Sequence, residues 1–219
     1  SLAVAGWAVL VAIPDPHATS APLHQHLPVA RVVADHRHVF ATAGVGAALL
    51  GVLRVSRAAI LPLWGDRIGL DAAQVSLLFG ISAAIDMTLF YPVGLVSDRL
   101  GRRAVAVPCL LLLSAGFVLV PFTDTFAQLA VAGVVMGRGN GLGSGIVMTL
   151  GADYAPPVGR ASFLGVWRLV SDVGQAGGPL LAGAVIGLAG LAAASGLVGA
   201  LGVAGAVVFL VALPPPHDD

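Results

Sequence analysis

The 219-residue sequence contains no lysine, no glutamate and a single cysteine, Cys109. Its eleven basic residues are therefore all arginine, its eleven acidic residues are all aspartate, and the formal net charge is zero. This balance lacks the excess of basic residues by which proteins bind nucleic acid, so no nucleic-acid partner is expected. The single cysteine excludes a disulfide within the chain. We interpret Cys109, which lies in an apolar run, as a small packing residue.

Apolar residues dominate the rest of the sequence, which is 58% hydrophobic, 10% charged and has a mean hydropathy of +0.95. Such values lie outside the range of soluble globular domains. A helix of about 20 apolar residues crosses the ~30 Å hydrocarbon core of a bilayer. We therefore predict an all-α polytopic membrane protein whose six-transmembrane-helix bundle covers residues 39–213. The predicted spans are residues 39–62, 73–95, 104–122, 126–150, 161–184 and 190–212.

Shorter segments flank this predicted bundle. The apolar run in residues 1–13 reaches only roughly 18 Å as a helix, so we interpret it as the truncated end of a membrane helix. Residues 14–38 contain four prolines and five histidines, which predicts a flexible cytoplasmic linker. No cysteine or clustered carboxylate completes a zinc-binding set with these histidines, so neither a metal nor a cofactor is expected. Residues 214–219 form a short polar tail.

The arginines outside the spans predict the orientation of the bundle. Six of them lie in the linker, in residues 95–103 and in residues 151–160, which are all on one side, whereas the opposite loops contain only Arg67. By the positive-inside rule, the arginine-rich side faces the cytoplasm. An even number of spans then places the C-terminus in the cytoplasm as well. A composition rich in Ala, Gly, Val and Leu indicates a GC-rich bacterial gene, so we expect a multi-pass protein of the bacterial inner membrane.

The most informative segment is Gly94-Leu-Val-Ser-Asp98-Arg99-Leu-Gly101-Arg102-Arg103, which connects the second and third predicted spans. One aspartate and three arginines between two membrane helices must lie in water at a membrane face, so we predict a charged turn here. The segment resembles the G-x-L-x-D-R-x-G-R-R/K signature of the major facilitator superfamily of secondary transporters. It departs from that signature only at Val96, where leucine is usual.

This resemblance implies the C-terminal half of a twelve-helix fold: the end of helix 6, the central loop and helices 7 to 12. It then implies a missing N-terminal six-helix half as a partner. In this family the aspartate of the motif, here Asp98, contacts a helix end in the opposite half and a nearby arginine, which stabilises the outward-facing state. Such a contact is worth up to ~1–2 kcal/mol, enough to bias a two-state equilibrium. The predicted gating residues are Gly94, Asp98, Arg99, Gly101, Arg102 and Arg103.

The arginines of the motif have two further interpretations. Arg102 and Arg103 are expected to face the cytoplasm and anionic lipid headgroups. Alternatively, the three arginines only set the orientation of the helices in the membrane.

Charged residues also occur inside the predicted spans, where each costs about 2.5–3.5 kcal/mol at a helix centre. Asp86 has no basic residue within one helical turn, and a desolvated carboxylate binds a proton more readily than one in water. We therefore interpret Asp86 as a candidate proton carrier, with a structural pair to Arg54 or Arg57 as the alternative. Arg54 is predicted to lie deeper than Arg57, which we expect to anchor at the membrane surface, so Arg54 is the candidate for an anionic substrate.

A second polar set lies on the predicted span 161–184. Arg168 and Asp172 are four residues apart, and Gln175 continues the same helix face. They form either a local ion pair or part of the wall of a polar cavity. The candidates for substrate binding or proton coupling are therefore Arg54, Asp86, Arg168, Asp172 and Gln175.

Two predicted helices carry patterned glycines. In the first, four glycines are spaced by four residues, which lets another helix approach closely in lipid. In the second, the pattern Gly165-x8-Gly174-x3-Gly178-Pro179-x2-Ala182-Gly183 is similar to the antiporter motif of drug:proton exporters in the same superfamily. That motif belongs to helix 5 of the family, so assignment of the chain to the N-terminal half is the alternative. The predicted helix-packing residues are Gly133, Gly137, Gly141, Gly145, Gly174, Gly178 and Pro179.

Together, these features predict a secondary active transporter that moves a small molecule across the membrane by alternating access. Proton-coupled efflux is the expected mode; the alternatives are an uptake symporter of the same superfamily and a non-transporting half-size membrane module. An enzyme is not expected, because all six histidines lie outside the predicted spans and no catalytic constellation lies within them. The expected partners are a small-molecule substrate, protons, the lipid bilayer and the missing half.

Overall fold

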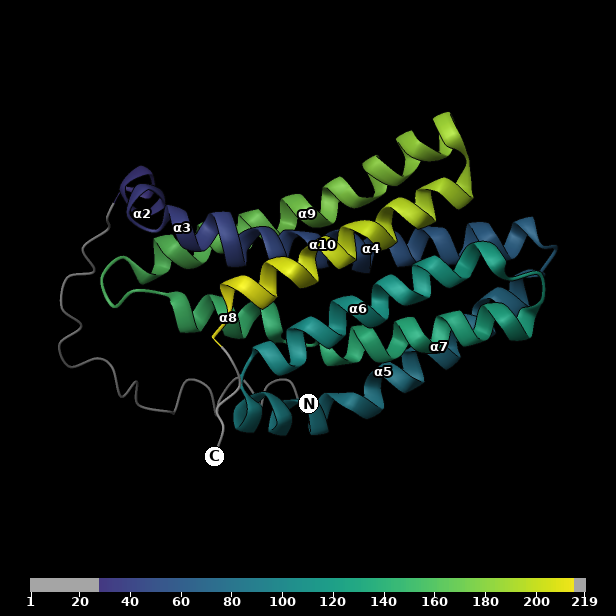
Figure 1. The fold of residues 1–219 in the computed structure, drawn as a ribbon, viewed down its shortest axis with the longest axis horizontal. Helices are drawn as coiled ribbons and strands as arrows, with labels where there is room; N and C mark the ends of the chain where they lie inside the picture. Colours follow the sequence, from purple (N-terminus) through teal and green to yellow (C-terminus); the bar gives the residue numbers. More distant parts are fainter. Residues whose placement is uncertain (1–27, 215–219) are drawn as a thin grey trace, which may run out of the picture.

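The computed structural model describes residues 28–214, which are helical throughout and contain no strand, as predicted (Figure 1). The predictions for residues 1–13, 14–27 and 215–219 lie outside this range. The helices in chain order are α2 (Val29–Asp35), α3 (Arg37–Val39), the π-helical turn η1 (Phe40–Gly44), α4 (Val45–Arg67), α5 (Ala72–Leu100), α6 (Arg103–Leu119), the 3-10 turn η2 (Val120–Phe122), α7 (Phe126–Leu142), α8 (Ile146–Tyr154), α9 (Arg160–Ala189) and α10 (Leu191–Ala212).

Within residues 28–214, five helical stretches are long and apolar enough to cross a membrane. The fourth predicted span, residues 126–150, is not among them because it is not one helix. α7 has 17 residues and ends at Leu142, and α8 begins at Ile146. The five stretches are residues 37–67, 72–89, 103–122, 160–189 and 191–212.

Glycine accounts for this break. Gly143 caps the C-terminus of α7, and Gly145 precedes α8 with a φ of +78°, a left-handed conformation that glycine adopts without steric cost. Nothing lies within 4 Å of the position that a Cβ of Gly145 would take. The prediction that Gly145 packs against another helix is therefore wrong; Gly145 lies in the break between α7 and α8. The prediction of a single helix over 126–150 is wrong for the same reason.

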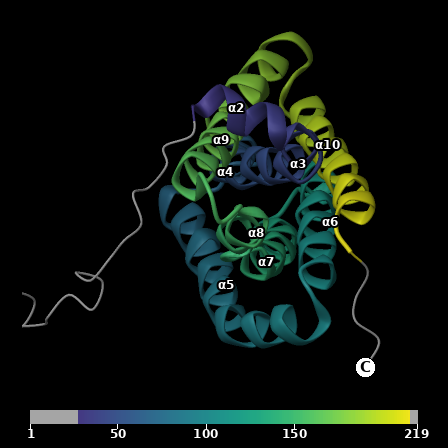
Figure 2. The same cartoon turned by 90° about the vertical axis from the view of Figure 1, so that its left-hand side faces the viewer.

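The helices pack around two central helices, α4 and α7 (Figures 1 and 2). α4 contacts α9, α10 and α7, whereas α5 packs mainly on α7, and α6 packs on α7 and α10. α5 and α9 are the outermost helices, with 11% and 22% of their spans buried, against 44–50% for the other three continuous spans. Their outer faces are largely apolar and therefore require cover by lipid or by another protein.

Three glycines of the four-residue stripe line the contact between α5 and α7. A Cβ on Gly133 would lie 3.1 Å from the Leu78 side chain, and one on Gly137 would lie 2.6 Å from the backbone oxygen of Ser82. A Cβ on Gly141 would lie 2.8 Å from the backbone oxygen of Asp86. The missing side chains thus allow the two backbones to touch, which is how helices gain packing energy in lipid.

α9 approaches α4 in the same manner. A Cβ on Gly174 would overlap the backbone of Ala48, and one on Gly178 would lie 2.9 Å from the backbone oxygen of Val52. Gly51 of α4 faces Gln175 and the backbone of Ser171 in return. Pro179, by contrast, lies within α9 with an exposed side chain.

The segment before α4 is more ordered than a flexible linker. Residues 29–35 form α2, and the helix that leads into α4 begins at Arg37, so the linker prediction is wrong for residues 29–38. The ring of His36 packs edge-on against Phe163 of α9 at a centroid distance of 5.3 Å, and Phe40 packs against the same ring at 5.0 Å. These aromatic contacts fasten the start of the bundle to α9.

We predict that Gly137→Ala destabilises the fold by about 1–3 kcal/mol, because the added methyl group overlaps the backbone of α5 and forces the two helices apart. Thermal unfolding in detergent, followed by circular dichroism, would measure the loss. Gly183→Ala is the matched control: Gly183 is also in the middle of a helix, but a Cβ there would meet nothing within 4 Å. Equal unfolding temperatures for the two variants would contradict the packing role of Gly137.

Candidate functional site

The predicted charged turn between α5 and α6 is shorter than expected. α5 continues to Leu100, so residues 94–100 are helical, and the prediction that the whole motif forms a turn is wrong. Gly101 makes the turn with a φ of +83°, and Arg102 precedes the first residue of α6. The charged side chains of the motif therefore lie at two helix ends: Asp98 and Arg99 at the end of α5, and Arg102 and Arg103 at the start of α6.

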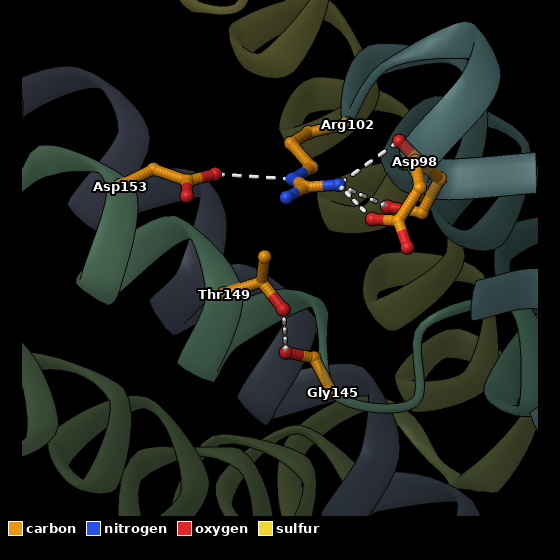
Figure 3. A network of polar contacts seen from close by, with 6 residues as sticks. Asp98, Arg102, Gly145, Thr149 and Asp153 are labelled. Carbon is orange, nitrogen blue, oxygen red and sulfur yellow. Dashed lines mark hydrogen bonds and ion pairs between the residues drawn. The ribbon is translucent and has the colours of Figure 1, made fainter. Parts of the chain in front are cut away.

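Arg102 is the centre of this turn (Figure 3). Its Nη1 donates to Asp98 Oδ1 at 2.9 Å and to the main-chain oxygen of Ser97 at 3.0 Å, and its Nε donates to Asp153 Oδ2 at 3.0 Å. We call Ser97, Asp98, Arg102 and Asp153 the Arg102 cluster. The cluster joins the end of α5 to the end of α8. Arg102 therefore makes ion pairs within the bundle, and does not simply face lipid headgroups as predicted.

The Asp98 carboxylate of this cluster remains available for a further contact. Hydrogen bonds to Asp98 and then to Asp153 raise the pKa of Arg102, which keeps the guanidinium charged. The Asp98 side chain remains 74% exposed although it is paired with Arg102. Arg99 and Arg103 make no ion pair within residues 28–214. Asp98 can therefore accept a further contact from outside this bundle.

A small cavity of about 220 Å³ lies between the end of α5, the start of α6 and the start of α8. Its wall contains Gly94, Ser97, Asp98, Arg102, Ser144 and Thr149. Thr149 is turned back on its own helix, where its Oγ1 donates to the main-chain oxygen of Gly145 at 3.0 Å (Figure 3). The break between α7 and α8 thus opens onto the Arg102 cluster.

A second polar cluster lies between α4, α5 and α7. The Asn140 side chain of α7 donates from Nδ2 to Asp86 Oδ2 of α5, and the Asn140 main-chain oxygen accepts from Arg54 Nη2 of α4 at 3.1 Å. Arg57 Nη1 reaches the main-chain oxygen of Met136 at 3.4 Å. We call Arg54, Arg57, Asp86 and Asn140 the Asp86 cluster.

This geometry revises both predictions for Asp86 and the arginines. Within the described residues, Asp86 makes no direct ion pair with Arg54 or Arg57; Asn140 connects Asp86 to Arg54. Arg57 is half-buried and contacts the main chain of α7. Asp86 Oδ1 and Arg54 Nε are buried without a hydrogen-bond partner in this part of the chain.

The Asp86 cluster lies next to Cys109 of α6, the only cysteine in the sequence. Cys109 is fully buried, and its Sγ lies 2.5 Å from the position that a Cβ of Gly143 would occupy. The nearest guanidinium nitrogen, Arg54 Nη2, lies 2.9 Å from the same position. Residues of α4, α6 and α7 thus converge where α7 ends.

The polar set on α9 has a different environment. Arg168, Asp172 and Gln175 are all exposed, and Asp172 Oδ1 accepts from Gln175 Nε2 at 3.2 Å. The alternative of an ion pair between Arg168 and Asp172 is wrong, because no such contact within 4.0 Å forms. Arg138 of α7 is also exposed. These side chains therefore lie on an open face of the bundle.

Two residues of these clusters were missed by the sequence analysis. Asn140 is the only asparagine in the sequence, and its position inside a predicted span was an available signal. Asp153 lay in a predicted loop. The only available signal for it was that Arg102 requires a negatively charged partner.

A bundle of membrane helices with a charged helix-end motif and an interior polar cluster defines a polytopic membrane protein of the transporter class. Residues 43–219 match the family model of the Major Facilitator Superfamily, and the chain belongs to this superfamily. The chain is 29% identical over 99 residues to the bacillibactin exporter of Bacillus subtilis, an alignment that covers 45% of the chain and 23% of that protein. It is 30% identical over 81 residues to the arabinose-proton symporter of the same bacterium, which covers 37% of the chain and 18% of that protein.

The matched stretches thus span less than a quarter of each relative's length. An exporter and a symporter resemble the chain about equally well.

We predict that Arg102→Leu loosens α8, because it removes the ion pair with Asp153 that holds the end of this helix, together with the ion pair to Asp98 that orients Arg102. Such partly exposed pairs are worth up to about 1 kcal/mol each, so amide exchange in residues 146–154 should become a few-fold faster. Hydrogen-exchange mass spectrometry would measure the change. Arg103→Leu is the control, since Arg103 makes no ion pair in the described chain. Unchanged exchange in Arg102→Leu would contradict the tie between α5 and α8.

Proposed function

We propose that this chain is the C-terminal six-helix half of a secondary transporter that exports a small molecule in exchange for protons. The observation that carries the proposal is the Asp86 cluster. It places a carboxylate among membrane helices, with one buried oxygen that has no partner in the described chain and can take up a proton. A group that gains and loses a proton at this depth can couple a proton gradient to a conformational change.

The Arg102 cluster provides the second requirement, a contact that forms and breaks during alternating access. Asp98 is paired on one side and exposed on the other, so it can bind the end of a helix from an N-terminal half. Nothing lies within 4 Å of the position that a Cβ of Gly94 would take, which leaves room for such a helix. The poorly buried faces of α5 and α9 supply the rest of this interface.

A specific observation favours uptake as the second candidate. The Asp86 cluster holds two arginines and one aspartate, so protonation of Asp86 raises its net charge from +1 to +2. A cluster that becomes more positive binds an anion more tightly. A proton and an anionic substrate would then bind together, as symport requires, whereas antiport requires that they compete.

Transport measurements separate these candidates. Everted vesicles from cells that express the native gene product would be energised, and an acid-sensitive dye would report the interior pH. Addition of bacillibactin should dissipate the proton gradient if the protein exports this compound by antiport. Addition of arabinose to intact cells should alkalinise the medium if the protein is a sugar-proton symporter. The absence of both responses across a wider panel of compounds would contradict proton-coupled transport.

We predict that Asp86→Asn abolishes proton-coupled transport, because the amide cannot take up a proton while it keeps the size of the side chain. The expected loss is at least about a hundredfold, the lower end of what a positioned proton-transfer group contributes. Asp66→Asn is the control, since Asp66 is exposed near the other end of α4. Transport by Asp86→Asn with an unchanged dependence on the proton gradient would contradict the role of Asp86.

A further inference from the structure

We propose that Asn140 is a positioning residue that transmits the protonation state of Asp86 to the break between α7 and α8. This proposal rests on the proposed function, in which Asp86 takes up the proton. Asn140 is well placed for this role because it connects three helices. Its side chain binds Asp86 of α5, its main-chain oxygen binds Arg54 of α4, and it lies in the last turn of α7, three residues before Gly143.

The surrounding backbone is closely packed but carries few side chains. Gly139, Gly141 and Gly143 flank Asn140, and glycine weakens a helix by about 1 kcal/mol per residue relative to alanine. Asn140 and Leu142 are thus the last side chains of α7. The hydrogen bonds of Asn140 therefore act together with the close packing of Gly139 and Gly141 to fix the end of α7 before the left-handed residue Gly145.

Protonation of Asp86 weakens these bonds. The Asn140 Nδ2 group is a donor, and a hydrogen bond from it to a charged carboxylate is roughly twice as strong as one to a neutral carboxyl group. The charged and titratable groups that face Asp86 are Arg54 and Arg57 from α4 and the Cys109 thiol from α6. Neither arginine binds Asp86 directly, so Asn140 is the contact that senses the change.

Cys109 allows the effect to be measured without knowledge of the substrate. It is the only cysteine, it is fully buried, and its Sγ packs against Gly143 at the break. When the end of α7 loosens, a small reagent reaches this thiol. The rate of reaction of Cys109 with N-ethylmaleimide therefore reports how often the break opens.

The experiment compares this rate across a pH series that extends from about pH 8 down to the ordinary range of a carboxyl group, about pH 4, in membrane vesicles that contain the native gene product. Each rate is divided by that of the same variant unfolded in detergent at the same pH, which removes the ordinary ionisation of the thiol. The wild-type ratio should be about tenfold higher at the acid end, the size expected for one hydrogen bond to a charged group. The Asn140→Ala ratio should be high at every pH, because the connection to Asp86 is gone.

Two further variants keep the test decisive. Asn140→Asp places a second carboxyl group beside Asp86, so the transition should move to higher pH. Ser82→Ala is the matched control: it removes another polar contact between α5 and α7, from Ser82 Oγ to the main-chain oxygen of Gly133 at 2.7 Å, and should keep the wild-type profile.

Failure of this proposal differs from failure of the proposed function. A wild-type ratio that does not change with pH, or an Asn140→Ala ratio that keeps the wild-type profile, would overturn the role of Asn140. If Asp86→Asn shows no pH dependence while Asn140→Ala behaves as wild type, only the role of Asn140 falls. If Asp86→Asn keeps the wild-type profile, another group takes up the proton, and both proposals fail.

Discussion

The cost of charge inside a membrane is the constraint on which this structure depends. Each ionisable side chain inside the membrane needs a polar partner or water, and a bundle of mostly apolar helices contains few of either. Asp86 finds its partner on α7 only because Gly137 and Gly141 let the α5 and α7 backbones touch. The glycine stripe and the polar cluster are therefore one feature. The stripe brings the helices close enough for a short amide side chain to connect a carboxylate on one helix to a guanidinium on another.

The same glycines lower the helix stability of the fourth predicted span, residues 126–150. A run that is rich in glycine packs closely, but it also loses helix stability, and here the helix ends at Gly143 and restarts after Gly145. A non-helical segment among membrane helices is tolerated only where protein or a cavity covers it. The neighbouring Cys109, Arg54 and the cavity below Arg102 supply that cover. α8 is thus a separate short helix, fixed at its far end by Asp153.

The sequence predicted what local patterns determine, and it missed what long-range contacts determine. Hydropathy placed the helices, and the spacing of glycines identified the surfaces at Gly137 and Gly174. The break after α7 was not predicted, because a tandem glycine stripe indicates close packing and helix interruption equally well. Asp153 and Asn140 were missed because their partners lie 51 and 54 residues away in the sequence. Periodicity within one helix carries no information about such pairs.

The two clusters hold the two ends of one segment, from the last turn of α7 to the end of α8, and this bears on the proposed transport cycle. Asn140 lies just before the break and Asp153 near the end of α8, so the segment from α7 to α8 is held by the Asp86 cluster at one end and by the Arg102 cluster at the other. A change of protonation at Asp86 therefore acts on the end of α7, and a change of contact at Asp98 acts through Arg102 on the end of α8. Coupling between sites needs an element with two arrangements that both sites bias, and in the proposed cycle the break between α7 and α8 is that element. Proton uptake in the interior and opening at the surface would then be linked through the short segment that both clusters hold.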